Sequence, residues 1–149
     1  MAVTTAIAAI GTVLKLGDGV LSTAPTFTAI AEVLSINGPT LSRDQIDVTH
    51  QATTGGFREF IGGLGDAGEV TFDISYVPSN TTHDVTAGLL KWLDSGLKTG
   101  FRVEWSDSPS TNWEFDAQVN GFEVTAAVDE QLKASVTLRL SGKPNFDAT

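Results

Sequence analysis

Alternation of apolar and polar residues with a period of two constrains this chain more than any other feature. The clearest example is the segment EVTFDISY over residues 69–76, and residues 101–106, 113–120 and 132–141 alternate in the same way. Successive side chains of a strand point to opposite faces, so each segment is predicted as an antiparallel strand with one buried and one solvated face. The fold class is therefore predicted as mainly β.

Weaker signals extend this pattern toward the start of the chain. Further strands are expected around residues 12–16, 27–36 and 43–50, and Asn37-Gly38-Pro39 is the predicted turn between the last two. The loop 107–112 joins two strongly alternating segments and predicts a hairpin.

Asn120-Gly121 is open to two interpretations. By local rules it forms a two-residue hairpin turn, but Phe122, Val124 and Ala126 could also continue the same strand past a glycine bulge. We favour the bulge.

One segment, residues 81–96, has the pattern of an amphipathic helix. Thr81 and Asp84 resemble a capping box at its start, and Gly96 is placed to end it in the left-handed conformation. The apolar side is formed by Val85, Leu89, Trp92 and Leu93. This predicts a single helix that covers one face of a sheet.

Two apolar segments have no evident partner within the chain. Residues 1–11 are small and uncharged, and residues 51–68 form a glycine-rich stretch that still contains large apolar side chains. A structureless loop of this length is uncommon in a compact domain and indicates function or partner contact. With 149 residues and 15.7 kDa, the chain is expected to form one domain over 1–149, with an arm at 1–11 and a tail at 142–149.

Charge and cysteine content exclude several function classes. The net charge of -9 argues against a protein that grips phosphate, and the absence of cysteine excludes disulfides and thiolate metal sites. Glu32, Asp47, Glu69 and Asp73 fall at or near solvent-facing positions of three predicted strands. If these strands share a sheet, its outer face is predominantly carboxylate.

No motif predicts an enzyme, a metal site or a cofactor. Residues 63–68 satisfy GxGxxG, but a strand follows them where a dinucleotide fold requires a helix. His50 and His83 are the only histidines, and neither has a second ligand at metal-binding spacing. We expect no membrane insertion either, since no apolar stretch approaches the ~20 residues that a bilayer requires.

The order of three segments resembles the major tail tube proteins of long-tailed, lambda-like bacteriophages (siphoviruses). These segments are FTAIAEVLSINGPTLSRDQIDVTH from Phe27, GGFREFIGGLGDAGEVTFDISYVPS from Gly55, and GFEVTAAVDEQLKASVTLRLSGKP from Gly121. The most specific element is the strand ending in IDVTH, followed by the glycine-flanked FREFIGGLGDAG and an alternating strand.

The resemblance implies a β-sandwich or incomplete antiparallel barrel flanked by one α-helix, related to the type VI secretion tube. It implies a non-enzymatic virion protein, made in the host bacterial cytoplasm, that polymerises as stacked hexameric rings into a hollow tail tube. The tube conducts double-stranded DNA during ejection without holding it. The implied partners are further copies of the chain, the tape measure protein, the tail terminator and distal tail or baseplate proteins.

The resemblance also implies roles for particular residues. Residues 51–68 match the loop that contacts the neighbouring ring, with Phe57, Arg58, Phe60, Ile61 and Leu64 as contact residues. The N-terminal arm, with Ile7 and Ile10, and the C-terminal tail are expected to contact neighbouring subunits. The four carboxylates Glu32, Asp47, Glu69 and Asp73 become candidates for the lumen, where negative charge repels DNA phosphates.

Two other function classes stay open at this point. The first is a monomeric β-sandwich module, such as a carbohydrate-binding or adhesin domain, in which Trp92, Trp105 and Trp113 offer a sugar platform. The second is a hydrolase that uses a pair of carboxylates.

Overall fold

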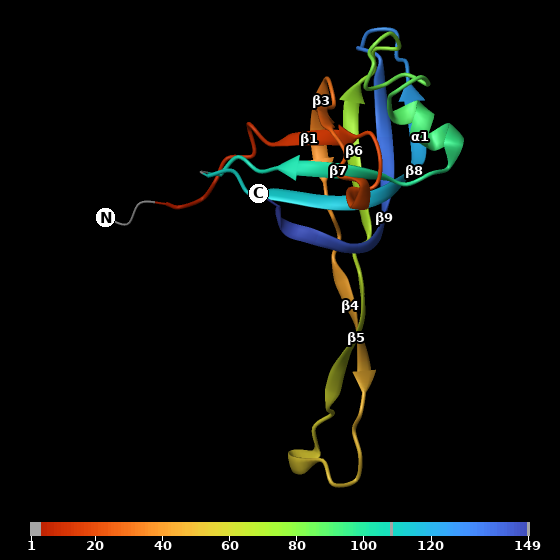
Figure 1. Cartoon of the computed structure of the whole chain (residues 1–149). Coiled ribbons are helices and arrows are strands. Elements are labelled where there is room, and N and C mark those ends of the chain that lie inside the picture. Colours follow the sequence, from red (N-terminus) through yellow and green to blue (C-terminus); the bar gives the residue numbers. More distant parts are fainter. Residues whose placement is uncertain (1–3, 108, 149) are drawn as a thin grey trace.

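The computed structural model describes residues 4–107 and 109–148 and is dominated by antiparallel strands (Figure 1). The strands are β1 (Val13–Gly17), β2 (Phe27–Ala29), β3 (Val33–Asn37), β4 (Ser42–Asp47), β5 (Phe60–Asp66), β6 (Glu69–Ser75), β7 (Thr99–Glu104), β8 (Asn112–Thr125) and β9 (Lys133–Ala148). The helix α1 spans Leu89–Ser95, and short 3-10 turns cover Leu21–Thr23 and Thr54–Gly56. Over the described residues, no helix has the length and hydrophobicity of a transmembrane span.

A seven-stranded sheet with the order β2-β1-β7-β8-β9-β6-β3 forms the body of the molecule. The two longest strands, β8 and β9, pair along most of their length, and their register shifts at three places. Such bulges bend a strand and increase its twist. The sheet therefore curls into two halves that face each other, and Figure 1 shows β7 crossing β6 steeply. The predicted incomplete antiparallel barrel is confirmed.

The core fills the space between the two halves and follows the predicted alternation. Phe72, Phe101 and Val136 are completely buried, and they come from β6, β7 and β9. The other fully buried apolar side chains are Val70, Ile74, Leu89, Val103, Ala117 and Leu138. Phe101 and Phe115 stack with their ring centroids 6.0 Å apart.

The glycine bulge predicted at Gly121 is confirmed. The strand β8 continues to Thr125, and its register against β9 shifts between Val119 and Gly121. Residues 142–148 of the predicted tail belong to β9, which pairs Asn145 with Glu114, and residue 149 lies outside the described residues. The long partner strand β8 extends the ladder beyond the last strongly alternating residue. The contact of this tail with neighbouring subunits stays a prediction.

The predicted helix over 81–96 is correct only in its second half, because α1 begins at Leu89. Residues 81–88 form turns in which the Asp84 carboxylate accepts hydrogen bonds from the amides of Thr86, Ala87 and Gly88, at 3.2, 2.9 and 3.1 Å. A short acidic side chain that binds nearby amides competes with helix formation. Gly96 ends the helix with φ +69°, as predicted.

The predicted strand over 27–36 is divided into two strands at opposite edges of the sheet. Between β2 and β3, Glu32 has a φ of +58°, which turns the chain from one edge toward the other. The Ser75 amide donates to the Glu32 carbonyl at 2.8 Å. Residues 30–32 therefore connect the two edges of the barrel.

The prediction of a long loop over 51–68 is wrong for residues 60–66, which form β5. This strand pairs with β4 in a separate two-stranded sheet, with Ile46 opposite Ile61. Figure 1 shows this β4–β5 hairpin projecting far from the body, as a continuation of β3 and β6. Glycines weaken a strand signal, and three of the seven residues of β5 are glycine, so the alternation was obscured.

Gly68 holds the junction between the hairpin and the body. Its φ is +70°, and a Cβ atom there would lie 2.1 Å from the Thr40 carbonyl oxygen. The Gly68 carbonyl accepts a hydrogen bond from the Leu140 amide at 3.1 Å, which ties the junction to β9. The direction of the hairpin is thus fixed by backbone contacts.

A side chain at Gly68 has two costs, the left-handed backbone conformation and the close approach of Thr40. Gly96 has the same backbone conformation without the close approach, so it measures the first cost alone. Gly96 has a φ of +69° with no atom within 4 Å of its Cβ position. We expect Gly96→Ala to lower the free energy of unfolding by about 1–2 kcal/mol, the cost of the left-handed conformation. Gly68→Ala is expected to lose roughly 1–3 kcal/mol more, because Thr40 must move. Urea unfolding of dilute protein measures both, and equal losses would contradict the close approach.

Candidate assembly surfaces

The β4–β5 hairpin carries large apolar side chains, and both of its faces are exposed. Phe57 and Leu64 expose 79% and 84% of their surface, and Phe60 and Ile61 each expose 52%. Arg58 at the tip is exposed as well. The structure thus gathers the five predicted contact residues of this segment on one projection. A two-stranded hairpin without a covered face is marginally stable in water.

Glycines of β5 make room for one long side chain that braces the hairpin. Arg43 extends across β5, and a Cβ at Gly62 would lie 3.1 Å from its Cδ. Its guanidinium donates to the Gly63 carbonyl at 2.8 Å. The aliphatic part of the arginine therefore takes the place of the side chains that the glycines lack.

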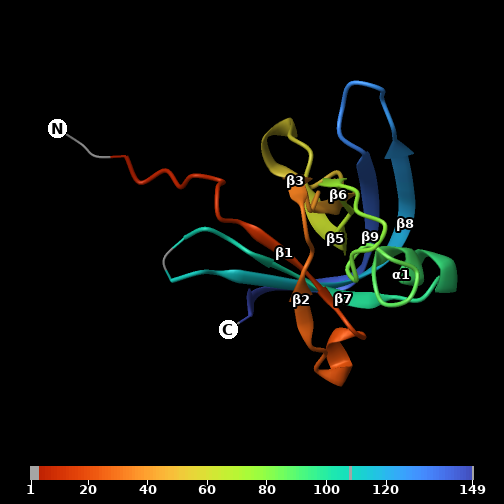
Figure 2. The ribbon, with the colours of Figure 1, turned by 90° about the horizontal axis from the view of Figure 1, so that it is seen from above.

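The N-terminal arm is a second exposed apolar segment, remote from the hairpin. Ile7 and Ile10 expose 64% and 87% of their surface. Figures 1 and 2 show the arm projecting sideways from the body, whereas the hairpin projects downward in Figure 1. The Ser106 hydroxyl donates to the Ala8 carbonyl and holds the arm at its root. Residues 1–3 of the predicted arm lie outside the described residues.

The curled sheet leaves two strands at its edges. β2 pairs only with β1, and β3 pairs only with β6, over the residues that the structure describes. An edge strand presents backbone amides and carbonyls that can pair with another chain. The two edges are therefore candidate surfaces for lateral contact.

The four carboxylates predicted for a lumen do not share one sheet. Glu69 and Asp73 lie on the outer face of β6, and Glu32 lies at the start of β3. Asp47 ends β4 and so belongs to the hairpin. The condition that their strands share one sheet is met for β3 and β6 but not for β4, which pairs with β5 in a separate sheet.

A cation partly neutralises the negative charge on the outer face of β6 and β9. Arg139 lies opposite Glu69 and forms an ion pair with Asp66 at 2.9 Å. The amide of Gly68 and then the guanidinium of Arg139 lower the pKa of Asp66 below its ordinary value of 3.8. On the hairpin, the hydroxyl and amide of Thr49 lower the pKa of Asp47 in the same way. Both carboxyls are therefore ionised at neutral pH.

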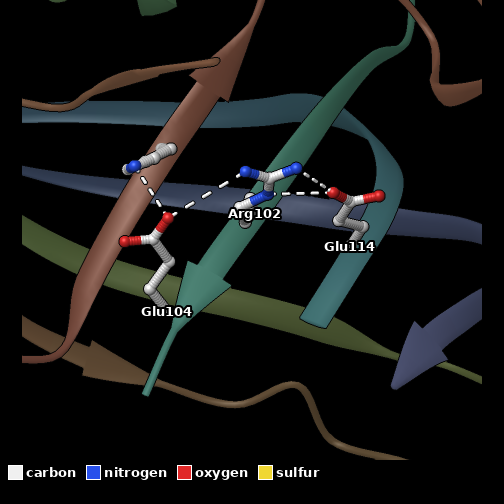
Figure 3. Close-up of polar contacts among 4 residues, drawn as sticks. Arg102, Glu104 and Glu114 are labelled. Carbon is white, nitrogen blue, oxygen red and sulfur yellow. Dashed lines mark hydrogen bonds and ion pairs between the residues drawn. The ribbon is translucent and has the colours of Figure 1, made fainter. Parts of the chain in front are cut away.

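The outer face of the other half of the sheet carries a balanced ladder of charges (Figure 3). Lys15 on β1 binds Glu104 on β7 at 2.7 Å, and Arg102 on β7 donates to Glu114 on β8 at 2.8 Å. The Arg102 guanidinium also lies 4.4 Å from the centre of the Phe27 ring on β2. Two cations and two carboxylates thus cancel each other while they join β1, β7 and β8, and the Phe27 ring adds β2.

Of the residues considered for a metal site or a sugar platform, His83, Trp105 and Trp113 make contacts within the fold. His83 is completely buried, where its Nδ1 accepts from the Val77 amide at 3.2 Å and its Nε2 binds the Ala31 carbonyl at 2.8 Å. Trp105 and Trp113 pack edge to face with their centroids 5.1 Å apart. No cluster of three or more metal-ligating side chains occurs within the described part of the chain.

A cavity of about 660 Å³ lies at the base of the hairpin. Its lining combines Leu41 and Arg43 from the hairpin with Leu140, Lys143 and Phe146 from β9. Phe146 is 39% exposed and packs edge to face on Trp113. The cavity therefore offers apolar walls with two cationic side chains.

Sequence reasoning missed several exposed apolar residues. Ile46 and Val48 belong to a segment that was predicted as a half-buried strand, yet both are exposed on the hairpin. Phe146 and Leu41 line the cavity, and Val128 is fully exposed at the β8–β9 turn. The available signal was the segment 43–50 itself, which has fewer apolar residues than the other predicted strands.

The chain matches a known protein family over most of its length. Residues 17–147 match the family described as lambda phage tail tube protein. The chain belongs to this family. It is therefore a structural component of the virion tail and not an enzyme. Among curated proteins, none matches the chain in sequence.

Solved structures confirm the tail tube fold. A chain from the tail of an empty gene transfer agent particle, refined with C6 symmetry, superposes with a TM-score of 0.76 at 17% identity and covers 96% of this chain and 100% of that one. A sheath/tube terminator structure of an extracellular contractile injection system gives 0.71 at 15% identity, with 99% and 100% covered. The SPP1 tail tube gives 0.65 at 9% identity, with 95% and 81% covered.

Proposed function

We propose that six copies of this chain close into a ring, and that rings stack into the hollow tube that conducts phage DNA into the host during ejection. Family membership and the tail tube fold support the proposal. The neighbours with this fold include a tail refined with C6 symmetry, which supports the number of copies per ring.

The observation that carries this proposal is the unsupported hairpin. Phe57, Phe60 and Leu64 stand exposed on two strands that have no covered face. Covering each such side chain contributes about 1.5–3 kcal/mol before ordering costs. In the proposed tube, the hairpin packs on a copy in the neighbouring ring, with Arg58 at the edge of the contact. The N-terminal arm, with Ile7 and Ile10, packs on another neighbour.

The open edges of the sheet suit the proposed ring. Pairing an edge strand of one copy with the next copy satisfies its free amides and carbonyls and makes the inner wall continuous. A head-to-tail contact that closes on itself gives a ring, whereas an axial contact that does not close gives a filament. Both contacts repeat at every copy, so modest affinities suffice.

The proposed lumen is lined by the outer face of β3, β6 and the adjoining parts of β8 and β9. Glu123 lies opposite Ser135, which lies opposite Asp73, so both carboxylates share this face with Glu69. Once Arg139 and Asp66 cancel, these three carboxylates outnumber Lys133. Glu32 adds a further negative charge just before the start of β3, and Asp47 adds another on the hairpin.

A negative wall suits a channel that must not retain DNA. Carboxylates repel phosphates at short range, and salt screens the repulsion beyond about 8–10 Å. The balanced ladder on the opposite half of the sheet carries no excess negative charge, so it would not repel phosphates. This difference favours β3 and β6 as the inner wall. Further proposed partners are the tape measure protein inside the tube, the tail terminator and distal tail or baseplate proteins at its ends.

The alternative of a carbohydrate-binding module finds no support in the tryptophans. Trp92 exposes only 8% of its surface in the core, and Trp105 and Trp113 pack against each other and Phe146. These contacts assign the three rings to packing within the fold.

Removing the apolar anchors tests the hairpin contact. We expect Phe57→Ser with Phe60→Ser to abolish tubes in negative-stain micrographs, while the urea unfolding of the monomer stays within about 0.5 kcal/mol of the unchanged protein. Leu97→Ser is the matched control, since Leu97 is 61% exposed and lies beyond the helix. Tubes of normal abundance in the double variant would contradict the role of the hairpin.

Reversing charge on the proposed inner wall tests the lumen. Asp73→Lys with Glu69→Lys is expected to leave tubes intact and to slow DNA release, because lysines bind phosphates. The rate of genome ejection from phage that carry the variant measures the effect. The matched control is Glu104→Gln, on the opposite half of the sheet. Normal ejection kinetics with both lysines in place would contradict the lumen assignment.

A further inference from the structure

The turn between β8 and β9 is exposed and acidic, and no contact described above explains it. Val128 is 101% exposed. Asp129 and Glu130 follow it directly, and residues 126–132 contain no cation. An exposed valine with two adjacent carboxylates at the tip of a long hairpin combines an apolar knob with negative charge.

The cavity at the base of the β4–β5 hairpin has the complementary chemistry. Leu41 and Phe146 expose apolar surface there, at 46% and 39%. Arg43 and Lys143 are the cations of its lining. The carboxylate in the same lining, Asp66, is already paired with Arg139 at 2.9 Å. The lining therefore keeps a net positive charge beside its apolar walls.

The turn and the cavity lie toward opposite ends of the molecule. Figure 1 shows the β8–β9 turn at the top and the β4–β5 hairpin leaving the bottom of the body. In a head-to-tail stack, the top of one copy meets the bottom of another. A knob and a pocket at the two ends of one chain cannot meet within that chain, but a head-to-tail stack along this direction can bring them together at each step.

We propose that the β8–β9 turn of one copy docks into the cavity at the hairpin base of a copy in the adjacent ring. Val128 enters between Leu41 and Phe146, and Asp129 and Glu130 face Arg43 and Lys143. The contact rests on the proposed stacking of rings and adds a second axial interface to that of the hairpin. Such a contact between two different surfaces does not close on itself, so it propagates along a filament.

The two contacts differ in their physical character. The hairpin supplies mainly apolar area, whereas the turn supplies charge at a defined position. Charge complementarity contributes to register and to the rejection of wrong arrangements. The turn therefore selects which copy of the adjacent ring each subunit contacts. It also sets the direction in which rings add.

Charge reversal at the two surfaces tests the contact. The variants are Glu130→Lys, Lys143→Glu, and both changes in one chain. Every copy in a stack supplies one turn and one cavity, so the double variant restores opposite charges at each contact. Asp94→Lys on α1 is the matched control for an exposed acidic residue that becomes basic.

We expect each single variant to keep its rings and to raise the protein concentration needed for tube growth by roughly tenfold, which corresponds to 1.4 kcal/mol per ring. The double variant is expected to return toward the unchanged protein, and Asp94→Lys to match it. Sedimentation of tubes over a concentration series measures this, with micrographs to count rings.

Three results would overturn the contact. Single variants that polymerise like the unchanged protein show that the turn does not dock in this cavity. Single variants that fail without recovery in the double variant show that the two surfaces do not meet. An unchanged protein that forms neither rings nor tubes overturns the proposed function, and with it this contact.

Discussion

Backbone hydrogen bonding between only two strands holds the β4–β5 hairpin, and the proposed assembly depends on that constraint. Two strands satisfy half of each other's amides and carbonyls, but they cannot bury a face. Ile46 and Ile61 face each other across the ladder and are still about half exposed. A hairpin of this kind persists where something else covers it. The family to which the chain belongs builds tubes, and the neighbouring copy in a tube is what the proposed assembly places over the hairpin.

The body can carry this projection because it is complete without it. Bulges in β8 and β9 curl one sheet into a barrel whose core contains Phe72, Phe101 and Phe115. The connection of residues 30–32 links its two edges, and Gly68 fixes where the hairpin leaves. The hairpin and the body are thus separate sheets. We infer that a single subunit folds its body alone and orders its hairpin on assembly, which would make growth of the proposed tube cooperative.

The body was predictable from sequence because burial is encoded by alternation. Val70, Phe72 and Ile74 are buried as that pattern requires, and the bulge at Gly121 followed from strand residues on both sides of a glycine. The errors arise where a local signal competes with a tertiary one. Asp84 binds amides and delays the helix to Leu89, and the glycines of β5 hide a strand that Arg43 braces. The exposed residues of the hairpin could be named from sequence, but the geometry of a contact could not, because the surface that covers them in the proposed assembly belongs to another copy.

Hydrogen exchange in the hairpin tests the central claim most directly. Peptides that cover residues 44–47 and 60–63 should exchange rapidly in the monomer, at rates near those of an unstructured chain. In assembled tubes the same peptides should exchange roughly a hundredfold more slowly. This slowing corresponds to about 2.8 kcal/mol of added protection. Peptides from β6 and β9 around Phe72 and Val136 serve as the reference, protected in both states. Strong and equal protection of the hairpin in monomer and tube would contradict the account, because it would show a hairpin that needs no neighbour.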